Sequence, residues 1–387
     1  MGHSTPALAD ASEDITLFRD MLLRCLDKEV LPHYDQWEKD GWMPKSAWLT
    51  LGAAGLLAPD MPEEYGAAGA PFEVSQMILE ETCRVGVHSL STALSVHSNI
   101  VAPYVNNLGT PEQKAMWLPK MITGEVIGSI GMTEPGAGSD LAGMRTTAVR
   151  QGDDYIINGS KTFITNGLHC GLLVLAAKTD PTLGAKGITL FLVDSSLPGF
   201  TKGKGIKKMG QHSNDTAELF FDNLRVPASA VLGEVNQGFV YLMQELPRER
   251  IGIGSQAIGA CEGAMAMTAD YVRQRKAFGQ PVAQFQNTRF TLAELRAQLE
   301  LTKAYWAHCV TRFKAGLMTT QEASILKLTS TELQVKLTHE CLQLFGGYGY
   351  TEEYPISRFF TDARVQTIYA GTSEIMKEII ARGELGR

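Results

Sequence analysis

The most informative stretch of the chain is residues 131–140, Gly-Met-Thr-Glu-Pro-Gly-Ala-Gly-Ser-Asp. It follows an apolar run, residues 126–130, and precedes a region of short apolar segments. Its proline fixes one φ angle and its glycines accept positive φ, so we expect a turn whose backbone N–H groups can face a ligand. Such a turn suits a flat, phosphate-bearing cofactor. It differs from the dinucleotide motif G-x-G-x-x-G, because Leu141 stands in place of the third glycine.

Hydrophobic periodicity changes on either side of this turn. Residues 12–125 have a helical pattern, and Thr110-Pro111-Glu112-Gln113 combines an N-cap, a proline at the first helical position and Gln at N3. Residues 132–233 contain short apolar runs separated by Gly, Asp, Pro and Asn, which predicts strands of a small sandwich or barrel. Helical periodicity returns after Gly238, and residues 319–322, Thr-Thr-Gln-Glu, mark a further helix start.

This change in hydrophobic periodicity predicts an α+β protein whose three domains follow the order helical, β, helical. The expected boundaries are an N-terminal helical domain over residues 1–128, a middle β-domain over 129–237 and a C-terminal helical bundle over 238–387. A chain of 387 residues is long enough for two or three domains, each with its own core.

Composition excludes several classes of protein. A formal net charge of −7 argues against nucleic acid or an anionic membrane as the main partner. The six cysteines include no C-x-x-C pair, so we expect reduced thiols. No apolar run approaches the roughly 18–20 residues of a membrane span, and the first residues have neither a signal core nor an Arg-rich transit pattern. We therefore expect a soluble, cytoplasmic protein.

Two apparent motifs are interpreted as structural. Residues 252–257, Gly-Ile-Gly-Ser-Gln-Ala, match G-x-G-x-x-A but follow a charged segment instead of a strand, which favours close helix packing over dinucleotide binding. His88 and His97 stand nine residues apart without a carboxylate or thiol at metal-ligand spacing, so no metal site is expected.

The stretch at 131–140 resembles a signature of the acyl-CoA dehydrogenases, a family of FAD enzymes. Four further segments resemble the same family and occur in its order. They are residues 161–167 (Lys-Thr-Phe-Ile-Thr-Asn-Gly), 273–279 (Arg-Gln-Arg-Lys-Ala-Phe-Gly) followed by Gln286, 343–350 (Gln-Leu-Phe-Gly-Gly-Tyr-Gly-Tyr) and 369–375 (Tyr-Ala-Gly-Thr-Ser-Glu-Ile). The resemblance implies that family's fold, with a β-sandwich or barrel in the middle and a four-helix bundle at the end.

The resemblance also implies a set of FAD-binding residues. Those expected near the flavin are Ile130, Met132, Thr133, Ser139, Phe163, Ile164 and Thr165. Those expected to bind FAD through the other resembling segments are Arg275, Phe278, Gln286, Gln343, Gly346, Gly347, Thr372 and Glu374. Because the segments around Arg275 and Gln343 resemble ones that touch the FAD of a neighbouring subunit, a homotetramer is expected.

The catalytic base implied by the resemblance is Glu249. Short- and medium-chain members have a glutamate before the Gly-Thr of the last segment, where this chain has Ala370. Long-chain and isovaleryl-type members instead have it on an earlier helix before an arginine, and residues 246–250, Leu-Pro-Arg-Glu-Arg, supply such a glutamate here. Local sequence alone leaves open a surface ion pair in a charged turn. The substrate-binding residues implied are Ser139, Arg250, Tyr369, Ala370 and Gly371.

The chain most resembles the long-chain members of the family. The resemblance implies α,β-dehydrogenation of medium-to-long acyl-CoA to trans-2-enoyl-CoA in fatty-acid β-oxidation, with electrons passed to an electron-transfer flavoprotein. A branched-chain dehydrogenase of isovaleryl or citronellyl type and an acyl-CoA oxidase remain alternatives. A third is a non-catalytic acyl-CoA-binding or scaffold protein. Pro103 interrupts the helical pattern of residues 99–107, and we expect it either to widen the acyl tunnel or to mark a helix start.

Overall fold

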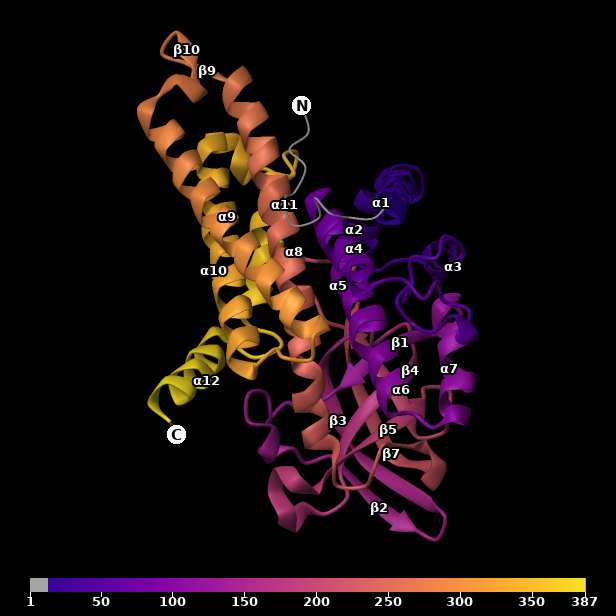
Figure 1. The fold of residues 1–387 in the computed structure, drawn as a ribbon. Coiled ribbons are helices and arrows are strands. Elements are labelled where there is room, and N and C mark those ends of the chain that lie inside the picture. The colour runs from indigo at the N-terminus through magenta and orange to yellow at the C-terminus, as the bar shows by residue number, and fades with distance from the viewer. Residues whose placement is uncertain (1–12, 387) are drawn as a thin grey trace.

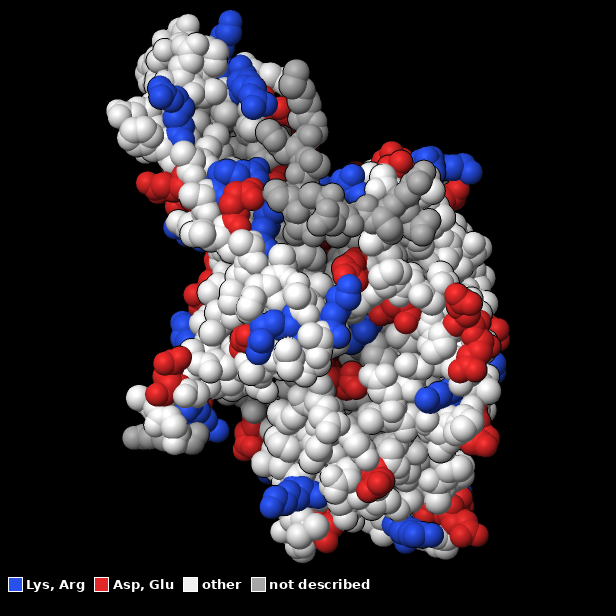
Figure 2. Space-filling view, viewed as in Figure 1, with Lys and Arg blue, Asp and Glu red and all other residues white. Residues whose placement is uncertain are grey.

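The computed structural model describes residues 13–386, which fold in the predicted order of helices, sheet and helices. In Figure 1 the sheet lies at the bottom, the first helices lie above and beside it, and a long helical bundle extends away from both. No helix within the described residues is long and apolar enough to cross a membrane. In Figure 2 basic and acidic side chains are interspersed over the visible face.

The N-terminal part is built from short helices around an apolar core. Thr110 and Gln113 form the predicted capping box at the start of α7, where each side chain bonds the other's backbone N–H. A π-helical segment, Ser95–Val101, separates two of the helices, and Pro103 follows in the first turn of the next one. The helices are α1 (Glu13–Cys25), α2 (Leu31–Asp40), α3 (Lys45–Ala53), α4 (Phe72–Arg84), α5 (His88–Leu94), α6 (Ala102–Leu108) and α7 (Pro111–Ile122).

The middle part is an eight-stranded sheet in the order β6-β7-β3-β2-β4-β5-β8, with β1 paired to β4. One half of the sheet is β6-β7-β3-β2 and the other is β4-β5-β8 with β1. The two halves are joined between β2 and β4 by the pairing of Thr147 with Lys178. Side chains from both halves share one core, in which the rings of Tyr155 and Phe191 lie 5.2 Å apart. The strands are β1 (Ile127–Gly131), β2 (Thr147–Gln151), β3 (Asp154–Thr165), β4 (Cys170–Lys178), β5 (Ile188–Asp194), β6 (Phe200–Gly205), β7 (Thr216–Pro227) and β8 (Val231–Leu232).

The C-terminal part is helical, as predicted. Three long helices, α8 to α10, pack with two short ones, and α4 of the N-terminal part also packs along α8. Thr319 and Glu322 form the predicted capping box at the start of α10. The elements are α8 (Gly238–Gln274), β9 (Lys276–Ala277), β10 (Gln280–Pro281), α9 (Gln286–Lys314), α10 (Thr320–Phe345), α11 (Ile356–Ala363) and α12 (Ser373–Leu385).

Small residues let α8 approach its neighbours closely. The G-x-G-x-x-A segment lies inside this helix and follows no strand, so the interpretation as helix packing is confirmed. A Cβ on Gly254 would lie 3.2 Å from the Leu326 side chain on α10. At Gly259 the approach is closer, because a Cβ there would lie 2.0 Å from the backbone oxygen of Glu80 on α4.

Substitution of Gly259 by alanine should therefore destabilise the fold. The added methyl group would force α4 and α8 apart, and overpacking of this kind costs about 1–3 kcal/mol of unfolding free energy. Gly383 is the matched control, because it is helical and exposed, and a Cβ there meets only the flexible end of Gln321. Urea titration should show a lower midpoint for Gly259→Ala alone. Equal midpoints for the two variants would contradict this account of the interface.

Candidate active site

The turn at residues 132–139 is fixed to the sheet by a buried ion pair. Lys161 on β3 is fully buried, and its Nζ donates to Glu134 Oε1 at 2.8 Å and to the carbonyl of Met132 at 3.1 Å. The backbone N–H of Thr162 donates to the carbonyl of Thr133 at 2.9 Å. Burial lowers the pKa of Lys161 to about 8, although Glu134 opposes this change.

The turn closes differently from the sequence expectation. Neither Gly136 nor Gly138 has a positive φ. Instead, Glu134 and Ala137 exchange backbone hydrogen bonds of 2.9 and 3.1 Å. A Cβ on either glycine would meet nothing within 4 Å, so the space above the turn is open and the backbone can be approached there.

The end of β3 presents an aromatic ring next to this turn. Phe163 is 65% exposed and has a φ of 58°, which is uncommon for a bulky residue. Successive side chains of a strand point to opposite faces, and Ile164 accordingly lies in the sheet core with 2% exposure. Of the predicted cofactor contacts on this strand, Ile164 can therefore offer its backbone but not its side chain.

Glu249 lies on α8 and is only 6% exposed, so it is not a surface ion pair. Burial raises its pKa to about 7, while a hydrogen bond of 3.2 Å from the Tyr104 hydroxyl acts in the opposite direction. The two flanking arginines point elsewhere. Arg248 pairs with Asp60 at 2.6 Å, and the buried Arg250 donates to the Ser324 hydroxyl at 3.1 Å. A carboxyl group with this pKa can exchange a proton near neutral pH.

The loop before α12 approaches the same part of α8. Ala370 and Gly371 have φ values of 50° and 93°, so two successive residues are left-handed. A Cβ on Gly371 would lie 3.7 Å from Nη2 of Arg250, which brings the loop against the residue next to Glu249. The buried Lys327 of α10 donates to the carbonyl of Gly371 at 2.7 Å. Tyr369 points its hydroxyl to Gln366 at 2.7 Å.

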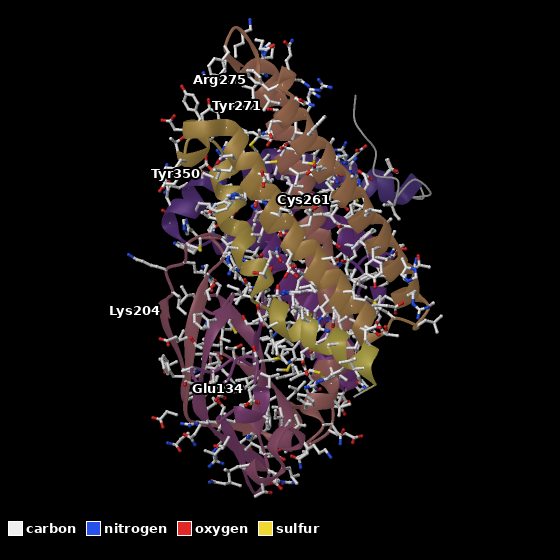
Figure 3. All side chains as sticks on the ribbon, turned by 90° about the vertical axis from the view of Figure 1, so that its left-hand side faces the viewer. Glu134, Lys204, Cys261, Tyr271, Arg275 and Tyr350 are labelled. Atoms are coloured by element: carbon white, nitrogen blue, oxygen red, sulfur yellow. The ribbon has the colours of Figure 1, made fainter. Side chains whose placement is uncertain are left out.

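A second group of predicted residues lies at the other end of the bundle. Arg275 and Gln343 line a hollow of about 590 Å³, together with Gly346 and Gly347. The hairpin β9–β10 carries Phe278 at its tip with 96% exposure. Figure 1 places this hairpin at the far tip of the bundle, and Figure 3 shows Arg275 and Glu134 near opposite ends of the molecule. One chain therefore does not bring all of the predicted cofactor residues together.

Gln286, Thr372 and Glu374 lie at helix starts. Gln286 is the first residue of α9, near the hairpin. Thr372 caps α12 by accepting a hydrogen bond from the N–H of Ile375, and Glu374 lies in the first turn of that helix. Both line a second hollow of about 460 Å³ with the basic residues Lys336 and Arg364. Glu332 lines the same hollow, so its two basic side chains are matched by two acidic ones.

Sequence reasoning missed three residues of this region, namely Tyr104, Lys161 and Lys327. Each is buried and bonds to a partner at least 27 residues away in the chain. The only available signal was a polar residue within an otherwise apolar or small-residue run, which is weak. Within the described residues, no cluster of three or more His, Cys, Asp or Glu could hold a metal ion.

Comparison with known proteins connects this geometry to a family. Residues 12–125 match the family description "Acyl-CoA dehydrogenase, N-terminal domain", 129–224 match the middle domain and 236–385 match the C-terminal domain. A mitochondrial long-chain specific acyl-CoA dehydrogenase of Rattus norvegicus is 46% identical over 373 residues. The match covers 96% of this chain and 86% of the rat protein.

Comparison with solved structures indicates the same family. An acyl-CoA dehydrogenase of Geobacillus kaustophilus is 46% identical with a TM-score of 0.95, over 97% of this chain and 99% of that one. A glutaryl-CoA dehydrogenase of Mycobacterium smegmatis in complex with FADH2 is 29% identical with a TM-score of 0.90, over 97% and 95% of the two chains. The chain therefore belongs to the acyl-CoA dehydrogenase family, and its activity is that of an acyl-CoA dehydrogenase.

Proposed function

We propose that this enzyme dehydrogenates medium-to-long linear acyl-CoA thioesters to trans-2-enoyl-CoA, as a step of fatty-acid β-oxidation, and that Glu249 is its catalytic base. The observation that carries the proposal is a buried carboxyl group whose pKa burial raises to about 7, on the residue next to Arg250, which the loop at Gly371 approaches. The 46% identity to a long-chain specific relative supports the substrate class. The family uses FAD, and we propose that this chain binds it too.

The residues present fit FAD. An exposed aromatic ring, Phe163, stands beside the open turn that carries the hydroxyls of Thr133 and Ser139. Arg275 has the charge and planar donor geometry that suit a diphosphate. When bound, FAD would supply the acceptor for a hydride from the substrate β-carbon. The protein's own task is to hold the thioester and to remove the α-proton.

Removal of the α-proton needs a base and a stabilised enolate. We propose that Glu249 accepts the proton on its carboxylate. The backbone N–H of Ala370 would donate to the thioester oxygen, because a backbone donor does not depend on the side chain at that position. Arg250 and Gly371 would shape the same pocket, with Lys327 holding the Gly371 carbonyl. Ser139 and Tyr369 are further candidates for substrate contact.

Glu249→Gln should bind FAD and acyl-CoA yet lose turnover by a factor of about 10²–10⁴, as expected for loss of a general base. The amide keeps the volume of the side chain, so the fold should be retained. Adding Ala370→Glu to this variant should restore part of the activity, because related enzymes hold their base at that position. Steady-state rates, with flavin content as the control, would test this. Near-normal turnover of Glu249→Gln would place the base elsewhere.

The acyl chain should run past the π-helical segment that precedes Pro103. A π-turn widens the helix, and the proline lacks the N–H that would complete an α-helical ladder. We expect kcat/KM to rise from short to medium-to-long linear thioesters and to tolerate branches far from the reacting carbons. Rates across acyl-CoA thioesters of increasing length would test this. A sharp optimum at butyryl-CoA or isovaleryl-CoA would contradict the expectation and favour the branched-chain alternative.

The electron acceptor that we propose is an electron-transfer flavoprotein. An acyl-CoA oxidase is the competing possibility, because it differs in using molecular oxygen. Turnover measured with an artificial one-electron acceptor and with oxygen alone would separate the two. Comparable rates with oxygen would favour the oxidase.

The cytoplasmic location and the domain boundaries stay predictions.

We also propose that the enzyme works as a homotetramer in which each FAD site is completed by a neighbour. The separation of Arg275 from Glu134 of the turn supports this, and Gln343 lines the same hollow as Arg275. The exposed Phe278 at the hairpin tip supports it as well. Contact with a neighbouring subunit would remove this apolar ring, which is 96% exposed, from water. Light scattering should give the mass of four chains, and an active, flavin-loaded monomer would contradict the proposal.

Arg275→Met should weaken FAD binding by a factor of about ten or more, since a charge-assisted contact to a diphosphate would be lost. Arg273→Met is the matched control. Arg273 is also an exposed arginine at the end of α8, but it pairs with Asp270 at 2.9 Å. Flavin released on dilution, followed by fluorescence, would give both dissociation constants. Equal constants for the two variants would remove Arg275 from the cofactor site.

A further inference from the structure

The buried carboxyl group of Glu249 receives a hydrogen bond from another part of the fold. Tyr104 lies on α6, and its hydroxyl donates to Oε1 of Glu249 on α8 at 3.2 Å. Tyr104 is 1% exposed, and the two residues are 145 positions apart in the chain. Within residues 13–386, no other side chain donates a hydrogen bond to this carboxylate.

The contact is one of two between the same helices. Asn107, one turn further along α6, donates to Oε1 of Glu245 at 2.9 Å, and Glu245 lies one turn before Glu249 on α8. Two donors spaced one helical turn apart thus meet two carboxylates with the same spacing. This match sets the register of α6 against α8 and fixes where the Glu249 carboxylate points.

The chemistry of the pair explains why a tyrosine is useful at this position. The ring packs into an apolar cluster with Val101, Val105 and Leu242, where a phenylalanine would satisfy packing alone. The hydroxyl adds a donor that interacts more strongly with an ionised carboxylate than with a neutral carboxyl group. A base that must be anionic before it can accept a proton gains from this preference.

We propose that Tyr104 is a positioning residue for the dehydrogenation, whose hydroxyl orients the Glu249 carboxylate and favours its ionised form. The inference rests on the proposed role of Glu249 as the base. In this scheme Tyr104 acts on the reaction only through the Glu249 carboxylate.

The other charges acting on Glu249 come from its own helix. Burial is the largest influence and raises its pKa, Glu245 also raises it, and both Tyr104 and Arg250 lower it. Lys327 on α10 is not among these groups. Burial lowers its own pKa, Arg250 lowers it further, and its Nζ donates to the carbonyl of Gly371. Tyr104→Phe therefore removes the contribution of the hydroxyl to the pKa of Glu249 and changes no charged group.

The test is the pH dependence of kcat/KM for Tyr104→Phe. Loss of the hydroxyl should raise the apparent pKa of the base from about 7 to about 8 or higher, given the strength of hydrogen bonds to charged groups. At pH values well below 7 the rate should then fall about tenfold or more, because a smaller fraction of the base is ionised. The alkaline plateau should change little, because the base is then ionised in both enzymes.

Tyr34→Phe is the matched control. Tyr34 is also a buried tyrosine of the N-terminal part, and its hydroxyl accepts a hydrogen bond from the N–H of Ser89 at 3.0 Å, away from Glu249. Its pH profile should equal that of the unchanged enzyme. A shift of similar size in the apparent pKa of Tyr34→Phe would overturn the inference. A general loss of packing in the fold would then explain the shifts in both variants.

A second variant keeps the test independent of folding defects. Incorporation of 3,5-difluorotyrosine at position 104 keeps the ring and strengthens the donor, so it should lower the apparent pKa, opposite to Tyr104→Phe. An unchanged profile in both variants, with Glu249→Gln inactive, would overturn the role of Tyr104 and leave the proposed base intact. An active Glu249→Gln would instead overturn the proposed base itself.

Discussion

The arrangement of the three parts depends on buried polar groups whose partners lie in a different part of the fold. Asp60 in the N-terminal part pairs with Arg248 on α8 at 2.6 Å. His88 on α5 lies 3.1 Å from Asp362 on α11, and the same carboxylate accepts from the N–H of Gln211 in the middle part. A buried charge without a partner costs several kcal/mol. If one of the three parts moved relative to the others, these buried groups would lose their partners. The pairs therefore stabilise the observed arrangement.

The same constraint gives three successive residues of α8 different surroundings. Arg248 faces the N-terminal part, Arg250 faces α10, and Glu249 between them faces the hydroxyl of Tyr104. Because both arginines are engaged elsewhere, Glu249 has no direct ion pair within the described part of the chain, and burial is the largest influence on its pKa. A salt bridge at this position would have kept the carboxylate ionised but would have weakened it as a base.

Much of this architecture follows from local sequence, while the buried pairs do not. The capping boxes at Thr110 and Thr319 were predictable because each is complete within four residues. The order of helices and strands followed from periodicity, and the glutamate of residues 246–250 from a resemblance. Tyr104 was not predictable, since its partner is 145 residues away. The inward direction of Ile164 also depends on pairing with β7, which local sequence does not reveal.

The position of the predicted cofactor residues has a consequence for assembly. Phe163 lies on β3 of the sheet, whereas Arg275 directly follows the last residue of α8, a helix of 37 residues. At a rise of about 1.5 Å per residue such a helix is roughly 55 Å long, and no rearrangement of side chains could bring both residues to one small molecule. Either the resemblance misassigns one group, or the tip of one chain reaches the sheet of another. The exposed ring of Phe278 projects from a two-residue hairpin turn of type I′, in which Phe278 and Gly279 have φ values of 51° and 79°. Its position at the tip, where another chain could be reached, favours the second explanation.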